Sequence, residues 1–358
     1  MRCRSVGPGW VLLLVLSACS GNDVRDSPDG GQGADASQSD AAALWDPGPN
    51  PYAMDDVLRV NHIQARATHN SYHMEPASPV ADSHRYTHAP LDVQLDAQGV
   101  RGLELDLHYR STPEFEGFEV FHLPAFDDQS TCQRFVDCLQ LLKAWSDSHP
   151  WHLPLMVWLE PKDEDADAFD DTLLPIEGRY DALEAEILEV WPRSRILAPD
   201  DVRGDHVDLP SALASDGWPT LGDARNKIMF ALLDSGTHRD AYVSTEDNLA
   251  GKLLFVDASD PADAYAAMFK DANPQDGRAL VEAGFLVTTN VAGADTPDAD
   301  AQAELEATLP SGMHFLADDT PAPVEDRSYF LDIPDGQPAR CNPVTAPAGC
   351  TSVDVEDL

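Results

Sequence analysis

Six polar residues stand at or near the ends of short apolar runs, and their types suit proton transfer and cation binding. They are His69, Asn70, Glu104, Asp106, His122 and Glu160. An imidazole titrates near neutral pH, so His69 and His122 can each give and retrieve a proton. Carboxylate and amide oxygens can hold a cation, so the pattern indicates a site that combines proton transfer with a bound cation.

The spacing of Glu104 and Asp106 indicates where a cation would bind. Residues two apart in a β-strand point to the same face. On an exposed strand both carboxylates would simply be solvated, but Leu103, Leu105 and Leu107 alternate with them and indicate a buried strand. Two buried carboxylates on one face repel each other, so we expect a positive charge between them.

The elements that must position these residues read as alternating strands and helices, which is typical of parallel βα units. Strands are expected at 63–68, 102–107, 119–122, 155–160, 227–233, 253–257, 285–289 and 313–317, with helices at 90–97, 132–149 and 180–190. Eight strands favour an α/β fold of the TIM-type (β/α)8 barrel, in which the carboxyl ends of neighbouring strands meet at one mouth. A doubly wound open sheet is the main alternative.

Four motifs follow one another along the chain: ATHNSYH, GVRGLELDLHY, VFHLP and LMVWLEPKDE. In this order they resemble the barrel motifs of phosphatidylinositol-specific phospholipases C, and particularly those of the calcium-dependent bacterial branch. The resemblance extends from about residue 58 to the C-terminal RCNPVTAPAGC. Each motif alone is common, but four at barrel-strand spacing form a specific combination. The resemblance implies a barrel of the phospholipase C-like phosphodiesterase type.

Carried over to this sequence, the resemblance implies that calcium is bound by Asn70, Glu104, Asp106 and Glu160. Ca²⁺ takes six to eight oxygen ligands, so these residues leave positions for water, a phosphate oxygen and a substrate hydroxyl. His69 and His122 then act on the phosphate. The implied partner is a phospholipid or another inositol phosphodiester.

In the implied reaction the inositol 2-hydroxyl attacks its neighbouring phosphate, and diacylglycerol leaves with inositol phosphate, cyclic or open, as the other product. We expect His122 to be the general acid and His69 to donate a hydrogen bond to a phosphate oxygen. Glu104 is the best candidate for the base. Lys162, two residues after Glu160, is expected to contact the phosphate, unless it is an ordinary surface lysine.

Three alternatives stay open at the level of the sequence. The stretch VTTN (Thr288, Thr289 and Asn290) stands where similar proteins tend to carry arginine, so another headgroup, such as a glycerophosphodiester, is possible. An inactive protein that binds lipid headgroups is a second alternative. A zinc site is a third, since His69 and His73 would share a face if residues 68–74 were helical.

Charge and cysteines describe the setting of the domain. With 63 acidic and 23 basic side chains the formal net charge is −40, which excludes nucleic acid as a partner held by a general positive field. Four cysteines in the domain predict two local disulfides, Cys132 with Cys138 and Cys341 with Cys350, and their spacing makes a zinc site less plausible.

The beginning of the chain has the pattern of an export signal. A basic start and an apolar run precede LSAC, which resembles a bacterial lipobox, so we expect residues 1–19 to be a lipoprotein signal with Cys19 as the lipidated residue. Ordinary signal cleavage nearby is the alternative. Residues 20–46 are expected to be a disordered tether, and residues 47–358 a single catalytic domain. The protein is therefore expected to be exported and anchored at the cell envelope through its lipid, or secreted.

Overall fold

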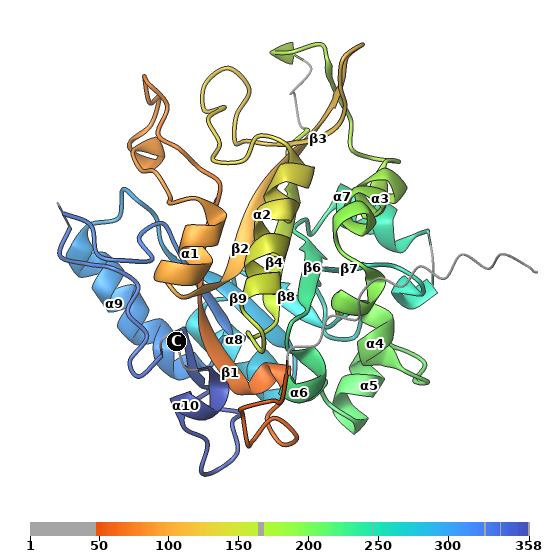
Figure 1. Cartoon of the computed structure of the whole chain (residues 1–358), viewed down its shortest axis with the longest axis vertical. Coiled ribbons are helices and arrows are strands. Elements are labelled where there is room, and N and C mark those ends of the chain that lie inside the picture. Colours follow the sequence, from red (N-terminus) through yellow and green to blue (C-terminus); the bar gives the residue numbers. More distant parts are fainter. Residues whose placement is uncertain (1–47, 164–167, 246, 326, 337, 357–358) are drawn as a thin grey trace, which may run out of the picture. The chain divides into compact units, whose positions relative to one another are not determined.

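Eight parallel strands form the centre of the described part of the chain, which in the computed structural model comprises residues 48–163, 168–245, 247–325, 327–336 and 338–356 (Figure 1). These residues belong to one unit, Pro47–Leu358. The parallel strands are β1 (Ile63–Thr68), β2 (Val100–Ser111), β4 (Leu155–Pro161), β6 (Ile228–Leu232), β7 (Leu254–Val256), β8 (Met268–Lys270), β9 (Leu286–Ala292) and β10 (Phe315–Asp318). The signal segment, Cys19 and the tether lie outside the described residues.

The order of the parallel strands is that of a nearly closed barrel. The neighbouring strands follow the order β7-β6-β4-β2-β1-β10-β9-β8, so β1 pairs with both β2 and β10. A single parallel bridge between Asp257 and Met268 joins the two ends, and the amide of Ala258 donates to the carbonyl of Met268 at 3.0 Å. The predicted barrel is therefore confirmed, and the open doubly wound sheet is excluded.

Helices connect the strands. The α-helices are α1 (Leu91–Ala97), α2 (Phe135–Ser148), α3 (Tyr180–Val190), α4 (Pro199–Arg203), α5 (Leu209–Ser215), α6 (Leu221–Ala224), α7 (Thr237–Val243), α8 (Pro274–Glu282), α9 (Asp298–Thr308) and α10 (Ser352–Val355). Short 3₁₀ turns lie at η1 (Val60–His62), η2 (Asp82–His84), η4 (Arg193–Arg195), η5 (Asp247–Leu249) and η6 (Leu309–Ser311). Helix α2 lies within the expected range 132–149 and buries Leu139, Leu142 and Trp145 at helical spacing, together with Phe135.

One expected barrel strand, at 119–122, is wrong. The structure has β3 (Glu116–Val120) there, which pairs antiparallel with the far half of β2 and extends beyond the barrel (Figure 1). The connection after Ser111 is a short turn, which can join antiparallel strands but is too short for a parallel crossover. Two further strands lie off the barrel: β5 (Leu173–Leu174) pairs with β2 and β11 (Ala339–Cys341) with β1, both antiparallel.

The barrel strand that the sequence did not predict is β8, which supplies the eighth position. It has three residues, Met268 to Lys270, and pairs in parallel with β9. Strands this short carry no readable alternation of apolar and polar residues. Both predicted disulfides are present, between Cys132 and Cys138 and between Cys341 and Cys350.

Candidate active site

Strand register brings the predicted residues to one end of the barrel. Asp106 on β2 stands directly beside Glu160 on β4, and Thr68 on β1 stands beside Asp318 on β10. His69 and Asp319, the residues that follow Thr68 and Asp318, therefore emerge side by side. The carboxyl ends of the strands thus converge at the mouth, as in other barrels of this kind.

A carboxylate cluster occupies this mouth. Glu104, Asp106 and Glu160 each offer an oxygen, and these oxygens all lie within 4.8 Å of one another. Asp106 is fully buried, and within the described part of the chain neither of its oxygens accepts a hydrogen bond. Burial is the main reason that the pKa of Asp106 is raised, and the nearby Glu160 and Glu104 add to it. Clustered carboxylate oxygens that accept no hydrogen bond are the ligands that a hard cation needs, so these residues fit Ca²⁺.

Two lysines partly balance the cluster. Lys162 lies 2.7 Å from Glu160 Oε1 and 3.6 Å from Asp106 Oδ2 through its Nζ. Lys270 Nζ lies 2.8 Å from Glu104 Oε2, and both side chains of this pair are only 2% exposed. Glu160 and Glu104 therefore each have a close ammonium partner, whereas the ammonium group of Lys162 approaches Asp106 only to 3.6 Å.

Lys270 was not predicted from the sequence, although it is in direct contact with Glu104. It ends β8, which lies opposite β2 in the strand order, so the contact spans the barrel mouth. Burial opposes the charges of both partners, but their mutual attraction prevails: the pKa of Lys270 is raised, and that of Glu104 is lowered to about 2. The ion pair therefore stays charged at neutral pH.

His69 lies between two acidic groups. Its Nδ1 is 2.9 Å from Asp319 Oδ1, and its Nε2 is 3.6 Å from Glu104 Oε1. Burial opposes protonation, yet Glu104 and Asp319 raise the pKa of His69 to about 9. Asp319 was not predicted from the sequence, although the two acids of LADDT directly follow the expected strand at 313–317.

The loop after β1, which carries Asn70, is fixed to β2 at Glu104. The amide of Ser71 donates to the Glu104 carbonyl at 2.9 Å, and the Glu104 amide donates to Ser71 Oγ at 2.9 Å. Asn70 is buried and adopts a left-handed φ of 42°, which asparagine tolerates better than most residues. The ring of His88 donates from Nε2 to the His69 carbonyl at 2.9 Å, so this histidine supports the loop.

His122 reaches the site from the loop after the β2–β3 hairpin. Its Nδ1 lies 2.8 Å from Asp127 Oδ2, and the ring of His108 donates to the carbonyls of Phe121 and His122. Because the Nδ1 of His122 is hydrogen-bonded to Asp127, the Nε2 of the same ring is the nitrogen that can act on a ligand. The side chain is 20% exposed.

Two adjoining cavities hold these groups. The first, of about 470 Å³, is lined by His69, Glu104, Lys270 and Asn290 among others. The second, of about 370 Å³, is lined by His122 and His108. Both include Glu160, Lys162, Leu233 and Asp234, so the two histidines approach one shared region from different sides.

The stretch VTTN contributes one residue to the first cavity. Thr288 and Thr289 are 4% and 6% exposed in β9, whereas Asn290 is exposed and lines the cavity. Its Oδ1 lies 3.4 Å from the Nζ of Lys270. The positively charged group beside this stretch is therefore the ammonium of Lys270, which belongs to the neighbouring strand β8.

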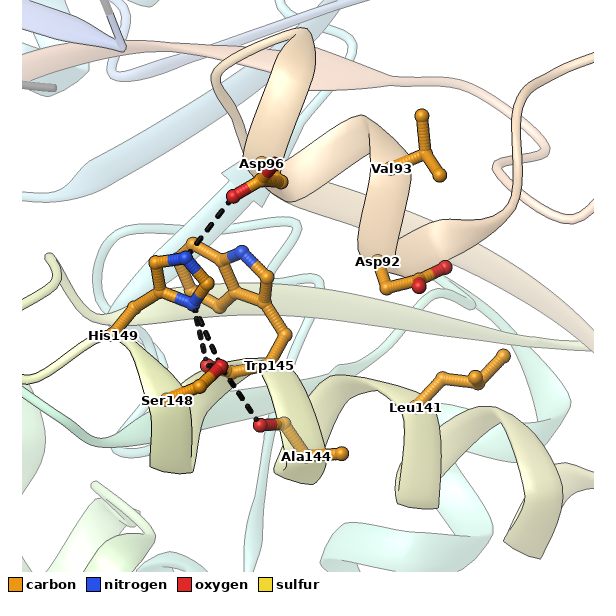
Figure 2. Close-up of a pocket in the computed structure, with 8 residues that line it drawn as sticks. All are labelled: Asp92, Val93, Asp96, Leu141, Ala144, Trp145, Ser148 and His149. Carbon is orange, nitrogen blue, oxygen red and sulfur yellow. Dashed lines mark hydrogen bonds and ion pairs between the residues drawn. The ribbon is translucent and has the colours of Figure 1, made fainter.

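A third cavity, of about 410 Å³, lies away from this chemistry in the groove between α1 and α2 (Figure 2). Its His149 lies 3.0 Å from Asp96 through Nε2 and 2.8 Å from the Trp145 carbonyl through Nδ1. Both ring nitrogens of His149 are therefore engaged within the groove.

Neither of the zinc sites considered from the sequence, the His69–His73 pair and the four cysteines, forms in the described part of the chain. Residues 68–74 are not helical, and His73 points to Asp127 instead of joining His69. The four domain cysteines are joined in the two disulfides. No helix in the described ranges is long and apolar enough to cross a membrane.

Comparison with known proteins adds a family to this geometry. Residues 58–114 and 109–343 match the sequence model described as "Phosphoinositide phospholipase C, Ca2+-dependent". A calcium-dependent phosphatidylinositol-specific phospholipase C from Streptomyces antibioticus has a similar fold, with 20% identity, a TM-score of 0.54, and 73% of this chain and 95% of that chain covered. A calcium-dependent enzyme from Pseudomonas sp. shares 17% identity at a TM-score of 0.54, covering 83% of this chain and 98% of that one. A comparison with curated protein sequences finds no match.

Proposed function

Because this chain belongs to the calcium-dependent phosphoinositide phospholipase C family, we propose that it cleaves phosphatidylinositol, or a closely related inositol phosphodiester, into diacylglycerol and inositol phosphate. It is an enzyme of the phospholipase C class, and its cofactor is Ca²⁺. The observation that carries the proposal is the buried Asp106 carboxylate, which lies with Glu104 and Glu160 at the same barrel mouth as His69 and accepts no hydrogen bond among the described residues.

We propose that Asn70, Glu104, Asp106 and Glu160 hold the calcium ion. When bound, Ca²⁺ lowers the pKa of a coordinated hydroxyl and balances charge that builds on the phosphate. The oxygen-rich donor set suits this ion better than zinc, which prefers nitrogen and sulfur ligands. Lys162 and Lys270 line the same cavity, so they can bind the phosphodiester as point charges.

The first chemical step removes the proton of the inositol 2-hydroxyl while its oxygen bonds to phosphorus. We propose Glu104 as the base, because a carboxylate that binds the calcium ion would also lie beside the coordinated hydroxyl. The pKa of Glu104, about 2, makes it a weak base, so it suits only a hydroxyl that has already been acidified. His69 stays protonated with its pKa of about 9 and donates a hydrogen bond to a phosphate oxygen.

The second part of the step breaks the bond between phosphorus and the glycerol oxygen. His122 donates its Nε2 proton to this oxygen, and diacylglycerol leaves. Asp127 holds Nδ1 and stabilises the imidazolium that must exist before the transfer, in the manner of other histidine–aspartate pairs. The nucleophile belongs to the substrate, so a cyclic phosphate is the first product.

Phosphorus NMR of the products tests this function. Phosphatidylinositol vesicles are incubated with the protein in calcium and in EDTA, beside vesicles of other phospholipids and a soluble glycerophosphodiester. We expect a cyclic inositol phosphate signal in calcium only, and from the inositol lipid only. Full activity in EDTA refutes the calcium mechanism, and equal rates on all headgroups favour a broader phosphodiesterase.

The setting of the enzyme is proposed separately. Two disulfides suit an exported protein, because disulfides persist in oxidising compartments. We propose that Cys19 carries a lipid that anchors the domain at the envelope. A Cys19→Ala variant should then leave the membrane fraction while its activity per molecule on soluble substrate is unchanged; retention in the membrane fraction would contradict the anchor.

A further inference from the structure

Three histidine side chains surround one buried carboxylate beside the active site. Asp127 is fully buried; His122 Nδ1 lies 2.8 Å from its Oδ2, and His73 Nε2 lies 2.9 Å from its Oδ1. His84 Nδ1 lies 3.3 Å from Oδ2. The rings of His84 and His122 stand edge to face with centroids 5.2 Å apart.

The proposed reaction uses only part of this cluster. One carboxylate contact is enough to hold His122, yet two more imidazoles converge on the same group. His84 is 8% exposed, and its Nδ1 makes no hydrogen bond among the described residues, although it points toward Asp127. A buried nitrogen without a hydrogen bond costs free energy unless it has another partner.

The ligand types and spacing of these residues suit a metal ion. One nitrogen from each of His84 and His122 and one oxygen from Asp127 all lie within 4.8 Å of one another. The separations of 2.8 and 3.3 Å are near the roughly 3.3 Å between ligand atoms in a tetrahedral site with bonds of about 2.0 Å. Two imidazoles and one carboxylate suit Zn²⁺, whereas Ca²⁺ prefers oxygen ligands alone.

We propose that His84, His122 and Asp127 bind Zn²⁺, or a similar borderline transition metal ion, at a site separate from the acidic calcium cluster. A water molecule completes the coordination. His73 orients Asp127 from the other side: its Nε2 contacts the carboxylate, and its Nδ1 donates to the Tyr86 carbonyl at 3.0 Å. Such outer contacts are typical of metal sites.

The consequence for turnover rests on the proposed function. When zinc binds, it replaces the proton on His122 Nδ1, which is released to solvent. Asp127 then holds the metal and no longer stabilises an imidazolium. His122 can therefore not serve as general acid while the site is filled, so zinc inhibits the enzyme even when calcium is saturating.

Zinc binding is measured directly, by isothermal titration of untagged protein in saturating calcium, and needs no substrate. We expect one zinc per chain for the wild type and an affinity at least about tenfold lower for His84→Gln. The matched control is His149→Gln, which changes a histidine paired with an aspartate on the outer surface (Figure 2) and should bind zinc as the wild type does. Absence of zinc binding, or unchanged binding by His84→Gln, overturns the site.

A second measurement does not depend on the folding of the variant. Co²⁺ added to the wild type in saturating calcium should give the intense visible absorption of a four-coordinate ion, whereas only weak six-coordinate bands would overturn the site. In the activity assay, zinc should inhibit the wild type, and His84→Gln should resist it by at least about tenfold in concentration. Zinc binding without inhibition refutes the regulatory role. If zinc binds but the protein has no phospholipase C activity, the proposed function is refuted and the zinc site is still supported.

Discussion

Replacing Asp106 by asparagine should stabilise the protein without calcium and remove most of the stabilisation that calcium gives. Asp106 is fully buried beside Glu104 and Glu160, and its oxygens accept no hydrogen bond within the described ranges. Asparagine has nearly the same shape but no charge. In EDTA the substitution removes a repulsive group, whereas in calcium it removes a ligand.

The size of the first effect follows from proton linkage. Burial raises the pKa of Asp106 in the folded state, so the folded protein keeps a proton that the unfolded chain has lost above about pH 4. The free energy of unfolding then falls as pH rises from that point to the folded-state pKa, by up to about 1.4 kcal/mol per pH unit. The Asp106→Asn variant lacks this titrating group. In EDTA, the difference by which its free energy of unfolding exceeds that of the wild type should therefore grow with pH.

The size of the second effect follows from ligand linkage. Calcium at a hundred times its dissociation constant stabilises the folded state by about 2.7 kcal/mol, which corresponds to roughly 4 °C in Tm for a domain of this size. The variant should gain much less at the same calcium concentration. The two effects have opposite signs, so no general loss of packing can imitate them.

Urea and thermal unfolding, followed by tryptophan fluorescence from about pH 5 to about pH 8, with calcium and with EDTA, measure both effects. Asp181→Asn is the matched control, because that side chain is 96% exposed. It should change neither the pH slope nor the response to calcium. A variant that is less stable than the wild type in EDTA, or that gains as much from calcium, would refute the placement of the cation at Asp106.

Three further predictions concern other parts of the site. His122→Ala should lower kcat by about 100-fold or more with little change in calcium binding, as expected for a lost general acid; a kcat within a few-fold of the wild type excludes that role. Lys270→Met should destabilise the calcium-free protein by about 3–5 kcal/mol in urea unfolding, since Glu104 becomes a buried charge without its partner, and an unchanged midpoint would show that the ion pair does not form. Phe126 and Phe169, which are 46% and 57% exposed and pack edge to face near the mouth, should contact the lipid surface, so changing both to serine should reduce cleavage in vesicles but not of a soluble substrate. Equal losses on both substrates would contradict contact with lipid.

Sequence patterns predicted much of the fold because its signals are local. The strand at Ile63–Thr68 and the helix at Tyr180–Val190 have the predicted bounds, and both disulfides close short loops. The strand at 119–122 was assigned wrongly, since an apolar run does not reveal whether its partner is parallel or antiparallel. That information lies in the length of the connection after Ser111.

The residue types and their spacing alone predicted that Glu104 and Asp106 share one face of a buried strand, and both side chains are buried in the structure. Only the tertiary structure decided which charges meet them. Lys270 reaches Glu104 across the barrel from a strand of three residues, and Asp319 meets His69 because β1 and β10 pair in register. The cluster around Asp127 likewise joins distant segments. Such contacts arise from closure of the barrel and from strand register, and these depend on the packing of the whole chain.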